Sequence, residues 1–111
     1  MDAGFERLKD AMAEAIAREV EFPVGVLVTV LGAKMTANTA HAKIVLSVFP
    51  EQAQPEVLER LRENERYVKE TLSERLRLRR IPRLHYTFDT TEARAEDIEL
   101  TLNRLSDNNE L

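Results

Sequence analysis

AHAKIVLSVF, residues 40–49, is the stretch of this 111-residue sequence that says most about its fold. Its alternate side chains are Ala40, Ala42, Ile44, Leu46 and Val48. Because successive side chains of a strand point to opposite faces, this run predicts a long strand with one wholly apolar face. Such a strand is typical of a sheet that helices cover on one face.

The segment before this strand predicts a helix and an earlier strand. Over residues 3–20, apolar side chains recur at steps of three and four, the stripe of an amphipathic helix formed by Phe5, Leu8, Met12, Ala15 or Ile16, and Val20. Pro23 ends this helix, because the residue before a proline is displaced from helical backbone angles. Valine alternates with other residues over 24–31, which predicts a strand, and residues 32–39 form the expected connection.

The segment after Pro50 predicts a second helical region and a third strand. Its apolar stripe consists of Val57, Leu58, Leu61, Tyr67, Val68, Leu72 and Leu76. Asn64 and Glu65 stand where this stripe should continue, so we expect a kink there, between two helices or within one bent helix. A period-two pattern then predicts the third strand, with Leu84, Tyr86 and Phe88 on one face, and a last helix is marked by Ile98, Leu102 and Leu105.

The predicted order is therefore α-β-β-α-α-β plus a C-terminal helix, which is an α+β fold with a three-stranded sheet covered by helices. Strands two and three are joined through helices, a crossover rather than a hairpin, so we expect a mixed sheet. Nothing in the pattern divides the chain. We expect one domain over residues 1–106 and a frayed tail over 107–111.

Composition excludes several classes of protein. No apolar run approaches the ~18 residues of a membrane span, and residues 1–20 lack the pattern of a secretory signal. The chain has no cysteine, which excludes a disulfide framework and fits a reducing compartment. We therefore expect a cytoplasmic protein with no membrane partner.

The residues that could support catalysis are few. His41 and His85 lack metal-ligand spacing, Ser47 and Ser73 lack a nucleophile elbow, and the three glycines form no phosphate-binding loop. The carboxylates of the helical region have basic partners four residues on, in the pairs Glu56 with Arg60 and Glu65 with Lys69. We interpret these pairs as solvated helix faces, and we expect no enzyme, no cofactor and no metal.

The charge of the chain is segregated although its formal total is only -4. Residues 1–59 carry 5 basic and 9 acidic side chains, residues 60–83 carry 9 and 4, and residues 84–111 carry 2 and 7. Between Arg75 and His85 there is no Asp or Glu. A local basic segment of this kind can attract an anionic partner, because charges beyond a Debye length of ~8 Å are largely screened.

The type of basic residue favours nucleic acid as that partner. Residues 75–83 hold five arginines, and the planar fork of arginine can bind two phosphate oxygens at once. No recognition helix or zinc finger is visible, and a bent helix pair beside a strand edge is more typical of an RNA module than of a DNA reader. Two alternatives stay open: an ordinary solvated surface held by its leucines, and a module that binds an acidic protein.

The sequence RLRLRRIPRL, residues 75–84, followed by Tyr86, Phe88 and Asp89, resembles the bacterial ribosome-binding factor A family. The similarity extends to Tyr67, Val68 and Lys69 ahead of it, to TANTAHAKIVLSVF at residues 36–49, and to DIELTLNRL at residues 97–105. It covers residues 5–105. Where the family has small residues at its helix kink, this chain has Asn64, Glu65 and Arg66, and asparagine tolerates a left-handed conformation better than most residues.

The resemblance implies a type II KH-like fold without a GxxG loop. It also implies a non-enzymatic factor that binds the small (30S) ribosomal subunit during maturation of 16S rRNA, in the cytoplasm and especially in the cold. We expect a monomer whose partner is 16S rRNA in free small subunits, with no DNA partner. The candidate RNA-binding residues are Arg62, Arg66, Lys69, Arg75, Arg77, Arg79, Arg80 and Arg83.

Overall fold

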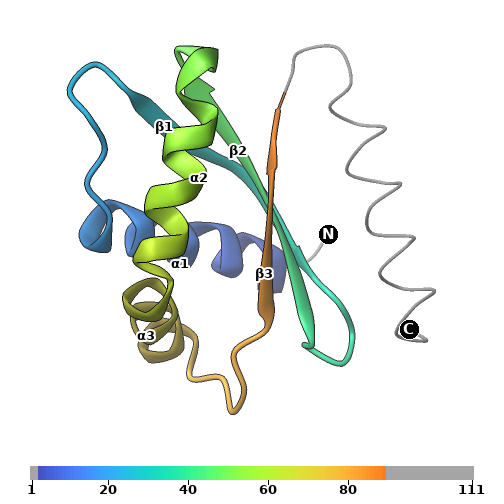
Figure 1. Ribbon diagram of the computed structural model, residues 1–111. Helices are drawn as coiled ribbons and strands as arrows, with labels where there is room; N and C mark the ends of the chain where they lie inside the picture. The colour runs from blue at the N-terminus through green and yellow to red at the C-terminus, as the bar shows by residue number, and fades with distance from the viewer. Residues whose placement is uncertain (1–2, 90–111) are drawn as a thin grey trace.

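A computed structural model of the chain describes residues 3–89, with side chains from residue 6 onward. Its elements are α1 (Ala3–Glu19), β1 (Leu27–Met35), β2 (His41–Phe49), a 3-10 turn η1 (Glu51–Ala53), α2 (Gln54–Glu63), α3 (Glu65–Leu76) and β3 (Arg83–Phe88) (Figure 1). The predicted order α-β-β-α-α-β and the α+β class are confirmed. The expected last helix and the frayed tail lie outside the described residues.

The three strands form one mixed sheet in the order β1-β2-β3. β1 and β2 are antiparallel neighbours, and β2 and β3 are parallel. The parallel pair follows from the connection between its strands, since a chain that returns through two helices enters the sheet in the same direction as before. The mixed sheet is thus as predicted.

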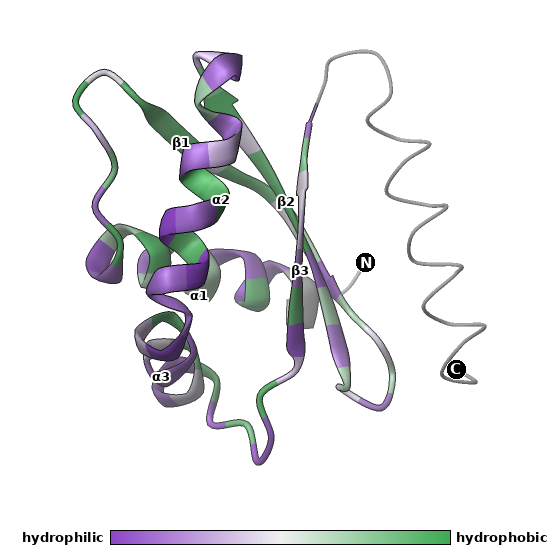
Figure 2. Cartoon of the chain, in the orientation of Figure 1, coloured by the Kyte–Doolittle hydropathy of each residue, from purple (hydrophilic) through white to green (hydrophobic). Residues whose placement is uncertain are grey.

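The core lies on one face of this sheet. Buried side chains of all three helices form one cluster with alternate residues of β2 and with Val30 and Ala33 of β1, which lie on either side of a register shift in that strand. The largest fully buried members of the cluster include Leu8, Met12, Ile44, Leu46, Leu61 and Leu72. These residues belong to the predicted stripes, and hydropathy colouring shows apolar segments of the helices alternating with polar ones (Figure 2). Within residues 3–89, no helix has the length and apolar character that crossing a bilayer requires.

The predicted bounds of the first strand were wrong at both ends. β1 begins at Leu27, which pairs with Phe49, the last residue of β2, so earlier residues have no strand to pair with. Gly25 instead adopts a positive φ of 89°, and the chain turns there. At the other end β1 continues to Met35, which pairs with Ala42. The connection between the strands is therefore shorter than expected.

Two further details of the predicted pattern differ in the structure. Lys43 and Val45 point to the face of the sheet opposite to Ile44 and Leu46, yet both are also buried. In α3, Tyr67 is 50% exposed rather than part of the stripe, and Thr71 is buried in its place. The Thr71 hydroxyl donates to Oε2 of Glu19 at 2.8 Å, which ties α3 to the end of α1.

Candidate nucleic-acid interface

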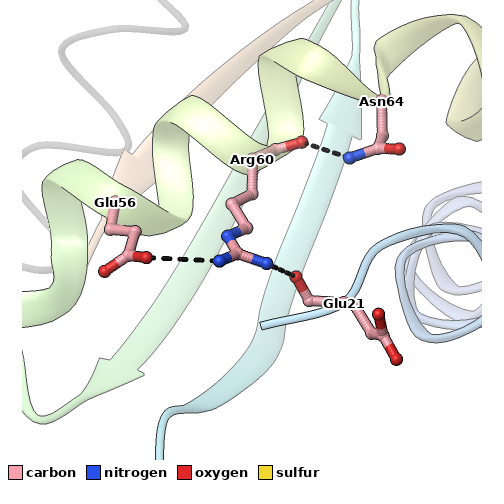
Figure 3. Close-up of polar contacts among 4 residues, drawn as sticks. All are labelled: Glu21, Glu56, Arg60 and Asn64. Carbon is pink, nitrogen blue, oxygen red and sulfur yellow. Dashed lines mark hydrogen bonds and ion pairs between the residues drawn. The ribbon is translucent and has the colours of Figure 1, made fainter. Parts of the chain in front are cut away.

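The kink between α2 and α3 falls at Asn64, as the interrupted stripe predicts. Asn64 does not use the left-handed conformation that asparagine tolerates, since its φ is -108° and its ψ is 14°. Its side-chain Nδ2 donates to the carbonyl oxygen of Arg60 at 2.8 Å (Figure 3), while its own carbonyl accepts from the backbone N–H of Val68 at 3.0 Å. The side-chain amide of Asn64 thus hydrogen-bonds a carbonyl at the end of α2, and the Asn64 backbone carbonyl accepts a hydrogen bond from the first turn of α3.

Arg60 makes a second contact in addition to the solvated ion pair with Glu56 that the sequence predicts. Its Nη2 lies 3.4 Å from Oε2 of Glu56, as the i,i+4 spacing predicted. Its Nη1 also donates to the backbone carbonyl of Glu21 at 2.8 Å (Figure 3). This second bond joins the end of α2 to the segment between α1 and β1, so Arg60 helps to fix the position of the kink.

A groove of about 230 Å³ lies where the kink faces β3. It is lined by Leu58, Arg62, Glu65, Leu84, His85 and Tyr86. The buried hydroxyl of Tyr86 has no hydrogen-bond partner within residues 3–89. Burial raises the pKa of Tyr86, and the nearby Glu65 carboxylate raises that pKa further. The hydroxyl therefore keeps its proton, and it can donate a hydrogen bond.

The arginine loop, residues 77–83, consists of the connection from α3 to β3 and the first residue of β3. Its apolar residues Leu78, Ile81 and Pro82 are half-buried or buried, whereas all four of its arginines are exposed: Arg77, Arg79, Arg80 and Arg83. The loop projects at the lower end of the molecule in Figure 1, and polar and apolar residues alternate along it in Figure 2. No ion pair joins any of these arginines to another residue of the described part of the chain.

Arg77 has an unusual backbone conformation. It caps the end of α3 with φ 53° and ψ 43°, the left-handed region, and its N–H donates to the carbonyl of Ser73 at 2.7 Å. Glycine is the usual residue at such a cap, since other L-residues lose about 1–2 kcal/mol there. An exposed arginine thus occupies a position where glycine would be less strained.

The other predicted residues are placed differently from the loop arginines. Arg75 is joined to Glu14 of α1, with 2.8 Å between Nη2 and Oε1. Arg66 and Lys69 pair along α3 with Glu70 and Glu65, at 3.5 and 3.0 Å. The kink patch consists of Arg62 in the last turn of α2 and of Arg66 and Lys69 in the first two turns of α3, and the arginine loop follows the end of α3. At a rise of about 1.5 Å per residue, Lys69 lies roughly 12 Å and Arg66 roughly 17 Å from Arg77 along α3.

A contact between the two histidines was not foreseen. Nδ1 of His41 lies 2.8 Å from Nε2 of His85, and the ring centroids are 5.0 Å apart. One ring must accept this hydrogen bond, so at least one of them is neutral. Desolvation lowers the pKa of His85, and the charges of His41, Arg83 and Lys43 lower it further. Within residues 3–89, no three metal-ligating side chains come together. No sequence signal reveals this contact, because the parallel register creates it.

Comparison with known proteins identifies the family. The family model described as ribosome-binding factor A matches residues 5–102. Similar curated proteins carry the same name: one from Cupriavidus pinatubonensis is 32% identical over 88% of this chain and 80% of its own length. One from Delftia acidovorans is 31% identical over 84% of this chain and 75% of its own length.

Two structures of ribosome-binding factor A from Thermus thermophilus are also similar to this chain. The crystal structure of ribosome-binding factor A from Thermus thermophilus matches with a TM-score of 0.65 and 28% identity, over 75% of this chain and 89% of that one. A homology model of the Thermus protein, fitted into a cryo-EM map of its complex with the 30S subunit, matches with a TM-score of 0.58 and 30% identity, over 74% of this chain and 87% of that one. The family match, the fold and the arginine-rich connection before β3 agree, and this chain belongs to the ribosome-binding factor A family.

Proposed function

We propose that this protein is a non-enzymatic assembly factor that binds the small ribosomal subunit and assists the maturation of 16S rRNA in the cytoplasm. The observation that carries the proposal is the arginine loop, which presents four exposed guanidinium groups without ion-pair partners in the described part of the chain. The family relationship supports it, as does the Thermus relative fitted into a map of a 30S complex.

The arginine loop suits phosphate binding for two physical reasons. Its apolar residues anchor it, Pro82 being fully buried, so little backbone freedom is lost when RNA binds. Its four arginines repel one another, and a chain of phosphates neutralises them while releasing counterions. The kink patch offers a second contact, roughly 12–17 Å from the first along α3, on phosphates further along the strand.

The proposed mechanism is conformational rather than chemical. A monomer bound to immature rRNA favours the rRNA arrangement that it fits and disfavours the others. It also prevents premature use of the subunit by occupying it. Because the family resemblance implies a role especially in the cold, we expect loss of the protein to slow growth more at low temperature than at high temperature.

Co-sedimentation tests this proposal. The protein should travel with free small subunits in a sucrose gradient, and Arg80→Glu should release it. Arg18→Glu is a matched control, since it is the same charge reversal at an exposed residue in the last turn of α1, outside the arginine loop and the kink patch. Recovery of the wild-type protein only in ribosome-free fractions would contradict the proposal.

The alternative, a module that binds an acidic protein, makes a different prediction in the same gradient. The protein would be absent from the subunit fractions, and treatment of the lysate with ribonuclease would leave its position unchanged. If the protein instead binds the small subunit, ribonuclease treatment that degrades the subunits releases it.

A further inference from the structure

Two adjoining hollows lie where α1 meets the end of α3, outside the groove at the kink. The larger, of about 320 Å³, is lined by Arg7, Asp10, Ala11, Arg75 and Leu76. The smaller, of about 140 Å³, is lined by Arg7, Leu8, Met35, Leu76 and Leu78. Because they share Arg7 and Leu76, we treat them as one feature, the α1–α3 groove.

The α1–α3 groove has an apolar floor and a charged rim. Leu8 and Ala11 of α1 are buried, and Leu76 and Leu78 are half-buried beside them. The charged lining residues are two arginines and one acid, all of them exposed: Arg7, Arg75 and Asp10. A flat apolar ligand with a polar edge fits such a site better than a chain of charges does.

The two arginines differ in how they are held. Arg75 is oriented by Glu14, at 2.8 Å, so its guanidinium group has a defined position before any ligand binds. Arg7 makes no ion pair within residues 3–89. Glu14 also contacts Arg18 at 3.6 Å, so its carboxylate is shared between two guanidinium groups. The rim therefore carries an excess of positive charge, which favours a ligand attached to phosphate.

Position relative to the arginine loop indicates which ligand this is. Leu78 belongs to the arginine loop and also lines the α1–α3 groove, so an RNA strand whose phosphates lie on the loop passes directly beside the groove. Unpaired bases of RNA are bound by stacking on apolar side chains and on arginine planes. A base that is already unpaired enters without the cost of leaving a duplex.

We infer that the α1–α3 groove binds a single unpaired RNA base, and that Asp10 selects guanine. A carboxylate only accepts hydrogen bonds, and it can accept two in parallel. The Watson–Crick edge of guanine presents two adjacent donors, N1–H and the N2 amino group. Adenine, cytosine and uracil each present one donor on that edge. This inference rests on the proposed RNA-binding function and deepens it.

Binding to RNA hairpins with one bulged nucleotide tests the inference. The four hairpins differ only in the bulged base, and a fully paired hairpin is the reference. We expect the bulged guanine to bind about tenfold more tightly than the other three, at the low end of what one bidentate base contact discriminates. Asp10→Asn should remove most of this preference, because the amide is a poorer match for two donors.

Glu6→Gln is the matched control, since Glu6 is an exposed acid of the same helix that does not line the groove. It should keep the guanine preference. Asp10→Asn and Glu6→Gln both remove one negative charge from an exposed position, so thermal melting should show both variants folded.

Two results would overturn the inference. One is equal binding of all four bulged hairpins with a normal salt dependence, which leaves phosphate binding by the loop intact. The other is an equal gain for every hairpin in Asp10→Asn, which makes Asp10 only a repulsive charge. Failure of the wild type to bind any hairpin or the small subunit would instead overturn the proposed function, and this inference with it.

Discussion

Arg75 and Glu14 join α3 to α1, with 2.8 Å between Nη2 and Oε1. Their side chains are 57% and 34% exposed, so solvent screens the pair and its contribution is small, about 0.2–1 kcal/mol. The first arginine of the cluster is therefore a link between helices as well as a surface charge.

Arg75→Ala should consequently have a small effect on stability and a small effect on phosphate binding. We expect the free energy of unfolding to fall by less than about 1 kcal/mol, measured by urea denaturation. We also expect a smaller loss of affinity for paired RNA than Arg80→Ala causes. A double-mutant cycle with Glu14→Ala isolates the pair, and a coupling near zero would mean that the contact contributes nothing in solution.

Arg77→Gly should raise the stability of the protein while weakening its binding to RNA. Glycine adopts φ 53° without strain, so the free energy of unfolding should rise by about 0.5–1 kcal/mol after the entropy of the unfolded glycine is offset. Affinity for RNA should fall, because one loop charge is lost. Arg79→Gly is the matched control, since it loses the same charge at a position without positive φ. If both variants changed stability alike, the left-handed cap would not be strained.

The salt dependence of RNA binding should report the loop arginines. Four neutralised phosphates of a single strand give a log-log slope of about -3. Arg77→Glu combined with Arg80→Glu should reduce that slope to roughly -1 and weaken binding strongly, while the melting temperature moves little because both side chains are exposed. The affinity should be measured at several salt concentrations for each variant.

Leu72→Ala is the contrasting control for that experiment. Leu72 is fully buried, so its loss should lower the free energy of unfolding by ~2–5 kcal/mol and leave the salt slope of the folded protein unchanged. If the double arginine reversal unfolded the protein and the slope of the folded remainder stayed the same, the loop would belong to the scaffold rather than to the binding surface.

His85 should make stability fall on acidification. Its pKa is lowered from 6.5 in the folded protein, so the unfolded chain binds more protons between the folded pKa and 6.5. Stability is then complete above about pH 6.5 and declines as the pH falls through this window. His85→Asn should flatten the decline in the free energy of unfolding between about pH 7 and 5, as measured by urea denaturation. An unchanged pH profile would mean that His85 is not its source.

The candidate site was only partly visible in the sequence. The density of arginine between Arg75 and Arg83, with no intervening acid, is a local property and pointed to phosphate. The sequence did not show that Arg75 forms an ion pair while the other arginines stay exposed, because Glu14 approaches Arg75 only after α1 packs on α3. Arg7 and Asp10 lie outside the apolar stripe of residues 3–20, and nothing local in the sequence links them to the arginine loop. Their place beside the arginine loop depends on helix packing.

Over residues 3–89 the sequence alone determined the helices, the strands, their order and the mixed sheet, because the spacing of apolar side chains and the length of each connection are local properties. Only the tertiary structure decided where β1 begins, since a strand extends as far as its partner does, and Leu27 faces the last residue of β2. It likewise decided the contact between His41 and His85, which depends on the register of β2 and β3. Strand register and helix packing bring together residues that are distant in the chain. The periodicity within one segment does not reveal which residues of another segment it will contact.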